Sequence, residues 1–142
     1  MRAIRTIIED QNPVTASAEI TVAAAARLMK ERRVGAILVV QDGRLAGIFT
    51  ERDALYRVIA EGRDPAATRV AEVMTANPRT IAPDRPFGHA LHLMYEGGFR
   101  HVPVVDNGRP LGLVSARDAL GPDLHEFIAE LDKRDHIGEI LG

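Results

Sequence analysis

The apolar residues near the start of the chain follow a helical spacing over residues 21–33. They fall at positions i, i+3, i+4 and i+7, which places them on one face of a helix: Val22, Ala25, Ala26 and Met29. Thr21 is a plausible N-cap, and Gly35 follows the charged end of the segment as the expected stop signal. The pattern therefore predicts an amphipathic helix.

A second pattern begins where this helix ends. Residues 36–40 form an unbroken apolar run, which is typical of a strand buried on both faces. The pair Asp42-Gly43 favours a two-residue hairpin turn, and residues 44–49 are predicted to form the returning strand. Thr50 is then expected to cap a helix that runs to about Glu61.

The same order of patterns occurs twice in the chain. Residues 12–55 align with residues 77–120 without a gap, and sixteen of the forty-four pairs are identical. Internal repetition on this scale decides the architecture, because each copy is one structural unit. Two copies are too few for an open solenoid, so we expect two related units that pack on each other as a closed pair.

In the second copy, a helix is predicted between a cap at Asp84 and a stop at Gly97-Gly98. Its apolar face consists of Phe87, Ala90, Leu91 and Met94. A hairpin follows, with strands predicted at residues 101–105 and 109–114 on either side of Asn107-Gly108. The second copy thus repeats the helix and hairpin of the first.

Other segments join or follow the two copies. Ser115 is expected to cap a helix that Gly121-Pro122 interrupts early. Residues 62–75 connect the copies, and a short packed helix is predicted there from Val70, Val73 and Met74. Residues 123–133 have helical apolar spacing at Leu124, Phe127, Ile128 and Leu131. This last helix either covers the module's own core or contacts a second copy of the chain.

Each copy is predicted to run strand–helix–strand–strand–helix, which gives an α/β (α+β) fold of two repeats packed as a pseudo-two-fold pair. We expect repeat 1 with the N-terminal segment over residues 1–64 and repeat 2 over residues 65–121. A C-terminal helical tail is expected over residues 122–142.

Composition and charge narrow the classes of function. The chain has 142 residues, 4% aromatic residues, no Trp and a net charge of −2, which disfavours nucleic-acid binding. It has no Cys, which excludes disulfides, thiolate zinc sites and cysteine nucleophiles. A chain without Cys also suits a reducing cytoplasm. We expect no membrane span, because no stretch approaches ~20 apolar residues. The first ten residues lack the apolar core of a signal peptide and are expected to be structural.

The candidate chemistry lies in a motif that recurs at Gly47–Asp53 and Gly112–Asp118, a glycine, two apolar residues, Thr or Ser, two further residues and Asp. A capping box explains a hydroxyl residue followed three positions later by an acid. Capping boxes favour Glu or Gln at that position, however, and both copies have Asp, whose two oxygens suit the two hydroxyls of a ribose. The hydroxyl at a helix N-terminus suits a phosphate, and a glycine permits close approach of backbone or ligand. Capping and ligand binding are compatible.

With these features the chain resembles a CBS-domain pair, the Bateman module, over about residues 1–120. The resemblance rests on the duplicated motif and on three further phrases: Thr21-Val22, residues 70–75 and residues 100–106. It implies a stand-alone regulatory module that senses an adenosine nucleotide in clefts between the repeats and signals to a regulated protein partner. AMP, ADP or ATP is the expected ligand, NAD(H) or S-adenosylmethionine is an alternative, no cofactor is obligatory, and a homodimer is expected.

The resemblance also assigns roles to residues. Asp53 and Asp118 would hold ribose, and Thr50 and Ser115 would contact phosphate or ribose. Adenine is expected on the first strand and its approach, near Thr15, Ala36 and Ile37 in repeat 1 and near Thr80 and Val102 in repeat 2. Arg100 and His101 occupy the place of phosphate-binding residues, just before Pro103, the proline typical of the family. Arg52 and Arg117 correspond between the repeats, and a solvated helix face is slightly favoured over a phosphate contact.

Differences between the copies predict two unequal clefts. Repeat 1 has Gly35 and Ala36 where repeat 2 has Arg100 and His101, which favours a phosphorylated ligand on one side. A module that binds no ligand and only associates with proteins is the alternative. No catalytic motif is present in the sequence, so we expect no enzyme activity. His89 and His92 are three apart, but two ligands do not make a metal site, and no metal is expected.

Overall fold

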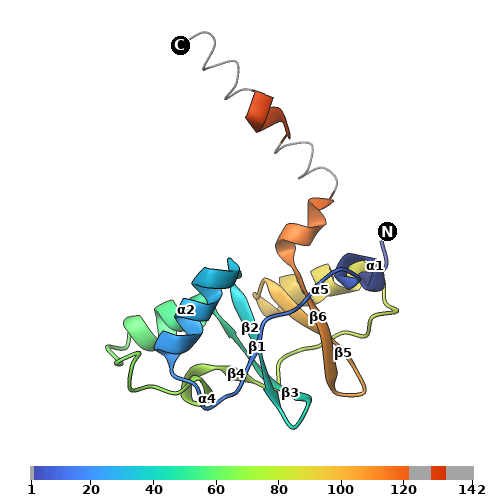
Figure 1. The fold of residues 1–142 in the computed structure, drawn as a ribbon. Coiled ribbons are helices and arrows are strands. Elements are labelled where there is room, and N and C mark those ends of the chain that lie inside the picture. Colours follow the sequence, from blue (N-terminus) through green and yellow to red (C-terminus); the bar gives the residue numbers. More distant parts are fainter. Residues whose placement is uncertain (1, 122–128, 134–142) are drawn as a thin grey trace.

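The computed structural model describes residues 2–121 and 129–133, and Figure 1 shows two repeats packed side by side. Repeat 1 and the segment before it contain α1 (Ile4–Ile8), β1 (Thr15–Ala16), α2 (Val22–Arg32), β2 (Ala36–Gln41), β3 (Arg44–Thr50), α3 (Glu51–Asp53) and the π-helix η1 (Ala54–Ile59). The connection and repeat 2 contain α4 (Val70–Val73), β4 (Thr75–Ala76), α5 (Phe87–Gly97), β5 (His101–Asp106), β6 (Arg109–Ser115) and the 3-10 helix η2 (Ala116–Ala119).

The order of elements confirms the predicted helices and hairpins of both copies. The predicted tail helix over residues 123–133 falls mostly outside the described residues, of which 129–133 are helical. The predicted helix after Thr50 is present, but from Ala54 it is a π-helix, closed by hydrogen bonds such as Ala60 N–H to the Leu55 carbonyl at 2.9 Å.

The two long helices differ from their sequence-based expectations at the end of α2 and at the start of α5. Thr21 caps α2 as predicted, since its side chain accepts the Ala24 N–H at 3.1 Å. The helix then ends at Arg33 (φ 55°) and not at Gly35, because Arg33 itself takes the left-handed conformation that turns the chain. Asp84 does not cap α5; the Phe87 N–H donates instead to the backbone carbonyl of Arg2 at 2.8 Å.

Both hairpins turn at the predicted positions. Asp42 and Gly43 have φ values of 53° and 75°, and Asn107 and Gly108 have values of 52° and 81°. Positive φ at two successive residues gives the turn whose twist matches that of the flanking strands. The register shifts at equivalent places, between Val39 and Val40 and between Val104 and Val105. The duplication therefore extends to the irregularities of the hairpins.

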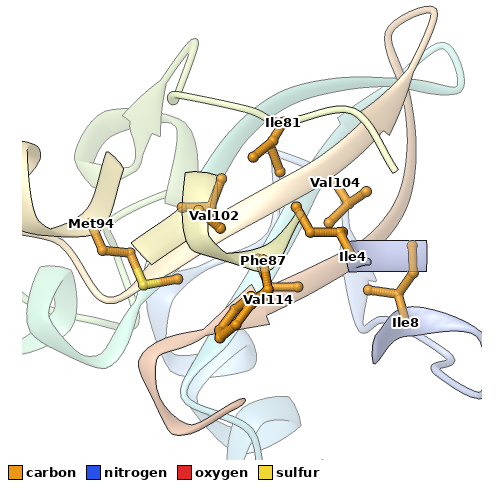
Figure 2. Packing of buried hydrophobic residues seen from close by; sticks show 9 residues of the cluster. Ile4, Ile8, Ile81, Phe87, Met94, Val102, Val104 and Val114 are labelled. Carbon is orange, nitrogen blue, oxygen red and sulfur yellow. The ribbon is translucent and has the colours of Figure 1, made fainter. Parts of the chain in front are cut away.

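The segments that precede the copies exchange partners. Ile4 and Ile8 of α1 are buried in the core of repeat 2, and Figure 2 shows them beside Phe87, Val104 and Val114. Val70 and Val73 of α4 are buried in the core of repeat 1. Burying one such side chain contributes about 1.5–3 kcal/mol, so each short helix is a substantial part of its neighbour's core.

The strand β2 is buried on both faces, as its unbroken apolar run predicts. Ile37 and Val39 belong to the core under α2, whereas Ala36 and Leu38 pack against Ile48 and against Leu113 of repeat 2. The second group forms the apolar contact between the repeats. The structure thus confirms the expected closed pair.

Candidate functional site

A cleft with a volume of about 1150 Å³ brings both copies of the motif together. Nine of the fourteen residues expected in the site line it: Ala36, Thr50, Arg52, Asp53, Arg100, His101, Ser115, Arg117 and Asp118. Both hairpins contribute, because the motif follows the second strand of each. Residues expected at two separate sites therefore line one continuous cleft, with Asp53 at its repeat 1 end and Asp118 at its repeat 2 end.

Five of the expected residues do not line this cleft. The side chains of Ile37, Val102 and Pro103 are fully buried, and Ile37 and Val102 belong to the hydrophobic cores of their repeats. Thr15 is exposed on β1, and Thr80 lines a separate pocket of about 200 Å³. On β2 and β5, the strands near which adenine is expected, the residues that line the cleft are Ala36, Leu38 and His101.

Asp53 forms the capping box that its spacing predicts. Its Oδ2 accepts the Thr50 N–H at 2.9 Å and lies 3.2 Å from the Thr50 hydroxyl, while the Asp53 N–H donates to that hydroxyl oxygen at 3.2 Å. Its Oδ1 faces the Arg57 Nε at 3.6 Å, and the residue is only 7% exposed. A ribose would therefore have to share this carboxylate with the cap and with Arg57, and the assignment to ribose stays a prediction.

Asp118 is held more loosely than Asp53. Its Oδ2 accepts the Ser115 N–H at 2.7 Å, but the Ser115 hydroxyl is 3.5 Å away, at the outer limit of a hydrogen bond. Asp118 is half-buried, and its backbone carbonyl accepts a hydrogen bond from the Arg2 guanidinium. Of the two motif aspartates, Asp118 is the more accessible to a ligand.

The motif glycines leave room for chain segments that cross the hairpins. A Cβ at Gly47 would lie 2.7 Å from the Met74 Sδ and 2.9 Å from the Thr75 carbonyl oxygen. A Cβ at Gly112 would lie 2.8 Å from the Gln11 Oε1. The sequence predicted that glycine permits close approach of backbone or ligand. The structure shows close approach by chain segments that pass over each hairpin.

The cleft is more positive than the chain as a whole. Seven basic residues line it: Lys30, Arg33, Arg52, Arg57, Arg79, Arg100 and Arg117. Three acidic residues also line it, Glu51, Asp53 and Asp118, which leaves an excess of four positive charges with His101 neutral. The whole chain carries a net charge of −2. Cations gathered in a concave site on an acidic chain favour an anionic ligand.

Two arginines of the cleft also hold the protein together. The Arg52 Nη1 donates to the Gly98 carbonyl at 2.9 Å, which links repeat 1 to the end of α5. The Arg57 Nη1 donates to the carbonyls of Val73 and Met74 at 3.1 and 3.0 Å. Arg57 was not among the predicted site residues, although its position four residues after Asp53 on a predicted helix is a signal for the ion pair between them.

His101 lies half-buried in the cleft at the start of β5. Burial lowers its pKa most strongly and Arg100 lowers it further, while the nearby carboxylates of Glu51 and Asp118 raise it. The net effect is a lowered pKa, because removing the imidazole from water disfavours its charged form. At neutral pH the ring is therefore uncharged and can either donate or accept a hydrogen bond.

In the part of the chain that the structure describes, no three or more His, Cys, Asp and Glu residues gather as a metal site would need. His92, one of the two weighed histidines, instead has its Nε2 2.9 Å from the Glu96 Oε1. Across residues 2–121 and 129–133, no helix has the length and apolar character needed to cross a membrane.

The chain matches a family model described as CBS domain, over residues 4–60 and again over residues 70–121. It is 36% identical over 118 residues to the mitochondrial CBS domain-containing protein CBSX3 of Arabidopsis thaliana, covering 80% of this chain and 57% of that protein. It is 39% identical over 104 residues to the CBS domain-containing protein YhcV of Bacillus subtilis, covering 73% and 74%. The chain thus spans little more than half the length of the first of these relatives.

Solved structures share the fold. The CBS-domain containing protein ATU1752 from Agrobacterium tumefaciens superposes with a TM-score of 0.77 at 30% identity, covering 84% of this chain and 97% of that one. The CBS domain protein PAE2072 from Pyrobaculum aerophilum, complexed with AMP, gives 0.75 at 25% identity, with 82% and 89% covered. The CBS domain pair of protein MJ0100, in complex with 5′-methylthioadenosine and S-adenosyl-L-methionine, gives 0.76 at 27% identity, with 84% and 93% covered.

Proposed function

The chain belongs to the CBS-domain family, and from that premise we propose that this regulatory module binds an adenosine nucleotide in the cleft lined by both repeats. The observation that carries the proposal is the excess of four positive charges in the cleft of an acidic chain. An uncharged ligand would need no such excess, whereas phosphate groups gain from it. The complexes of PAE2072 with AMP and of MJ0100 with two adenosine compounds support the adenosine part.

The proposal assigns separate ligand contacts to residues of the cleft. Asp118 holds the ribose through the carboxylate oxygen that does not accept the Ser115 N–H, and Asp53 does so at the other end. Arg100 and His101 meet the phosphate. AMP, ADP or ATP fits best, while NAD(H) and S-adenosylmethionine share the adenosine half and are secondary. The module uses no obligatory cofactor and catalyses no reaction.

Regulation follows from the position of the cleft. A ligand that touches both repeats stabilises the arrangement in which both sets of contacts are made, and it shifts the population only by its difference in affinity between arrangements. A regulated protein partner would read that shift. We place the module in the cytoplasm, because a chain without cysteine suits a reducing compartment.

Calorimetric titration with AMP, ADP, ATP, NAD⁺ and S-adenosylmethionine tests the proposal, with thermal denaturation alongside. A ligand at a hundred times its Kd stabilises the native state by about 2.7 kcal/mol, which raises Tm by several degrees. Asp118→Asn should weaken binding, while Asp84→Ala, which removes an exposed carboxylate outside the cleft, should not. Absence of heat and of any Tm shift with all five ligands would overturn the proposal.

A module that only associates with proteins is the second candidate. It is favoured by three exposed apolar side chains on η1, Leu55, Tyr56 and Ile59, which are 51%, 59% and 66% exposed. Clustered apolar residues on a surface helix are typical of an interface, and a second copy of this chain is the partner we infer, giving a homodimer. Sedimentation velocity should then show a dimer that Tyr56→Lys with Ile59→Lys dissociates. Nucleotide insensitivity together with that dimer would favour this candidate over the first.

A further inference from the structure

The two ends of the cleft are built around the same backbone hydrogen bond. In repeat 1, the Glu51 N–H donates to the Gly35 carbonyl at 3.0 Å. In repeat 2, the Ala116 N–H donates to the Arg100 carbonyl at 2.9 Å. Because residues 35 and 100 correspond in the repeat, as do residues 51 and 116, these four residues occupy equivalent positions that share this backbone hydrogen bond.

The side chains at these equivalent positions differ in charge between the two repeats. Repeat 1 has no side chain at Gly35 and a carboxylate at Glu51, whereas repeat 2 has a guanidinium at Arg100 and a methyl group at Ala116. All four residues line the cleft. Repeat 1 therefore contributes a negative group where repeat 2 contributes a positive one, and the Glu51 carboxylate is also near enough to His101 to raise its pKa.

The Glu51 carboxylate lies over Gly35. A Cβ built on Gly35 would be 3.1 Å from the Glu51 Oε1 and 3.3 Å from its Cδ. In repeat 2 the side chain of Arg100 begins at the equivalent of that Cβ, so the Glu51 carboxylate lies beside the place where the arginine side chain starts. A phosphate brought to this end would meet a like charge at close range.

The other basic residues near the repeat 1 end either have neighbours of their own or come from another element. Arg57 is held by Asp53 and by the carbonyls that end α4, and Arg52 donates to the Gly98 carbonyl. Lys30 and Arg33 come from the end of α2, where repeat 2 has Tyr95 and Gly98. At the Glu51–Gly35 hydrogen bond itself, Glu51 is the residue whose charged group lies over the Gly35 backbone.

We propose that Glu51 is a specificity-determining residue that keeps phosphate out of the repeat 1 end, so that the two ends take different adenosine compounds. The end with Arg100 takes a phosphorylated adenosine. The end with Glu51 takes a nucleoside whose 5′ group is uncharged or cationic, such as a thioether or a sulfonium. This assignment rests on the proposed function and names its ligand class at each end.

Calorimetric titration with AMP and with 5′-methylthioadenosine tests the assignment. The wild-type chain should bind one AMP per chain tightly and accept 5′-methylthioadenosine in addition when AMP is saturating. Glu51→Ala and Glu51→Gln should each raise the affinity for a second AMP by about tenfold, since a like charge at several ångströms is removed. Ala116→Glu should lower the affinity for the first AMP by about tenfold. Glu61→Ala, which removes a carboxylate outside the cleft, is the matched control and should change neither affinity.

The outcomes separate the two proposals. Two equal AMP sites in the wild-type chain, unaltered by Glu51→Gln, would overturn the role of Glu51 while leaving the nucleotide-binding function intact. A change with Glu51→Ala but none with Glu51→Gln would show a steric effect and would also overturn the charge argument. Binding of neither compound to any variant would overturn the proposed function and this inference with it.

Discussion

Repeat 1 and repeat 2 have one plan but complete their sheets differently. In repeat 1, β4 lies along β3, with Gly47 opposite Ala76, and the sheet has four strands in the order β1-β2-β3-β4. In repeat 2 the sheet consists of β5 and β6, and the side-chain amide of Gln11 makes the equivalent contacts, donating to the Leu113 carbonyl at 2.8 Å and accepting its N–H at 2.9 Å. The comparison teaches that the hairpin turns and the burial of equivalent positions are shared, whereas the edge of each sheet is completed by different groups.

The largest expected effect comes from equivalent core positions with different side chains. Phe87 and Val22 correspond, and both are 2% exposed. Phe87→Ala should cost about 3–5 kcal/mol of unfolding free energy, because it leaves a large cavity and removes the ring that the Arg2 guanidinium faces at 5.6 Å. Val22→Ala removes two methyl groups and should cost about 2 kcal/mol. Denaturant unfolding measures both values, and equal losses would contradict the unequal packing of the two cores.

Removing the side-chain substitute for a strand is expected to have the next effect. Gln11→Ala deletes both hydrogen bonds to Leu113 and should cost about 1–2 kcal/mol. Amide hydrogen exchange at Leu113 should accelerate, while exchange at Ile48, the equivalent position in repeat 1, should not change locally. Unaltered exchange at Leu113 would mean that the amide of Gln11 does not complete this edge.

The two capping boxes offer a smaller contrast. Thr50→Ala removes two hydrogen bonds of 3.2 Å with Asp53 and should cost about 1 kcal/mol. Ser115→Ala removes a longer contact of 3.5 Å and should cost less than Thr50→Ala. Thermal denaturation of the two variants ranks them, and a larger loss for Ser115→Ala would reverse the assignment of Asp118 as the looser of the two aspartates.

The smallest expected effect is a pH dependence of the unfolding free energy that arises from His101 of repeat 2. Burial lowers the pKa of His101 in the folded chain, so the unfolded chain binds a proton more readily. Stability is therefore fully present above the ordinary histidine pKa of about 6.5 and is lost as pH falls from there towards the lowered value. Denaturant midpoints measured from pH 7 downwards should fall less steeply in His101→Gln than in the wild-type chain. Parallel curves would show that this imidazole does not contribute.

What the sequence predicts well is local. The hairpin turns, the apolar face of α5 and the cap at Thr21 depend on residues close together, and each is confirmed. The apolar face of α2 is confirmed at Val22, Ala25 and Met29, whereas Ala26, predicted on the same face, is exposed. The stops and caps that were wrong depend on distant or conformational partners: the α5 start is satisfied by the Arg2 carbonyl, and Arg33 ends α2 in a left-handed conformation that its side chain does not signal.

The site was predicted in part for the same reason. The motif residues that follow each hairpin line the cleft, because the strand ends fix where they emerge. Ile37 and Val102 do not line it, because strands buried on both faces direct alternate side chains into the cores. The contact of Arg57 with the Val73 carbonyl could not be predicted, because the two residues are brought together by folding. The proximity of Glu51 to Gly35 follows from the register of the predicted hairpin, in which Ala36 pairs with Thr50, and was missed.

The exchange of α1 and α4 makes each repeat incomplete without the other. A single copy with its preceding helix could fill its core only with the helix of another molecule, as in a domain-swapped dimer. The connection over residues 62–69 makes this encounter intramolecular, where a short linker gives an effective concentration of the order of millimolar. The stability of the intact chain is therefore independent of protein concentration. If the connection were cut, folding would depend on the concentration of the two fragments.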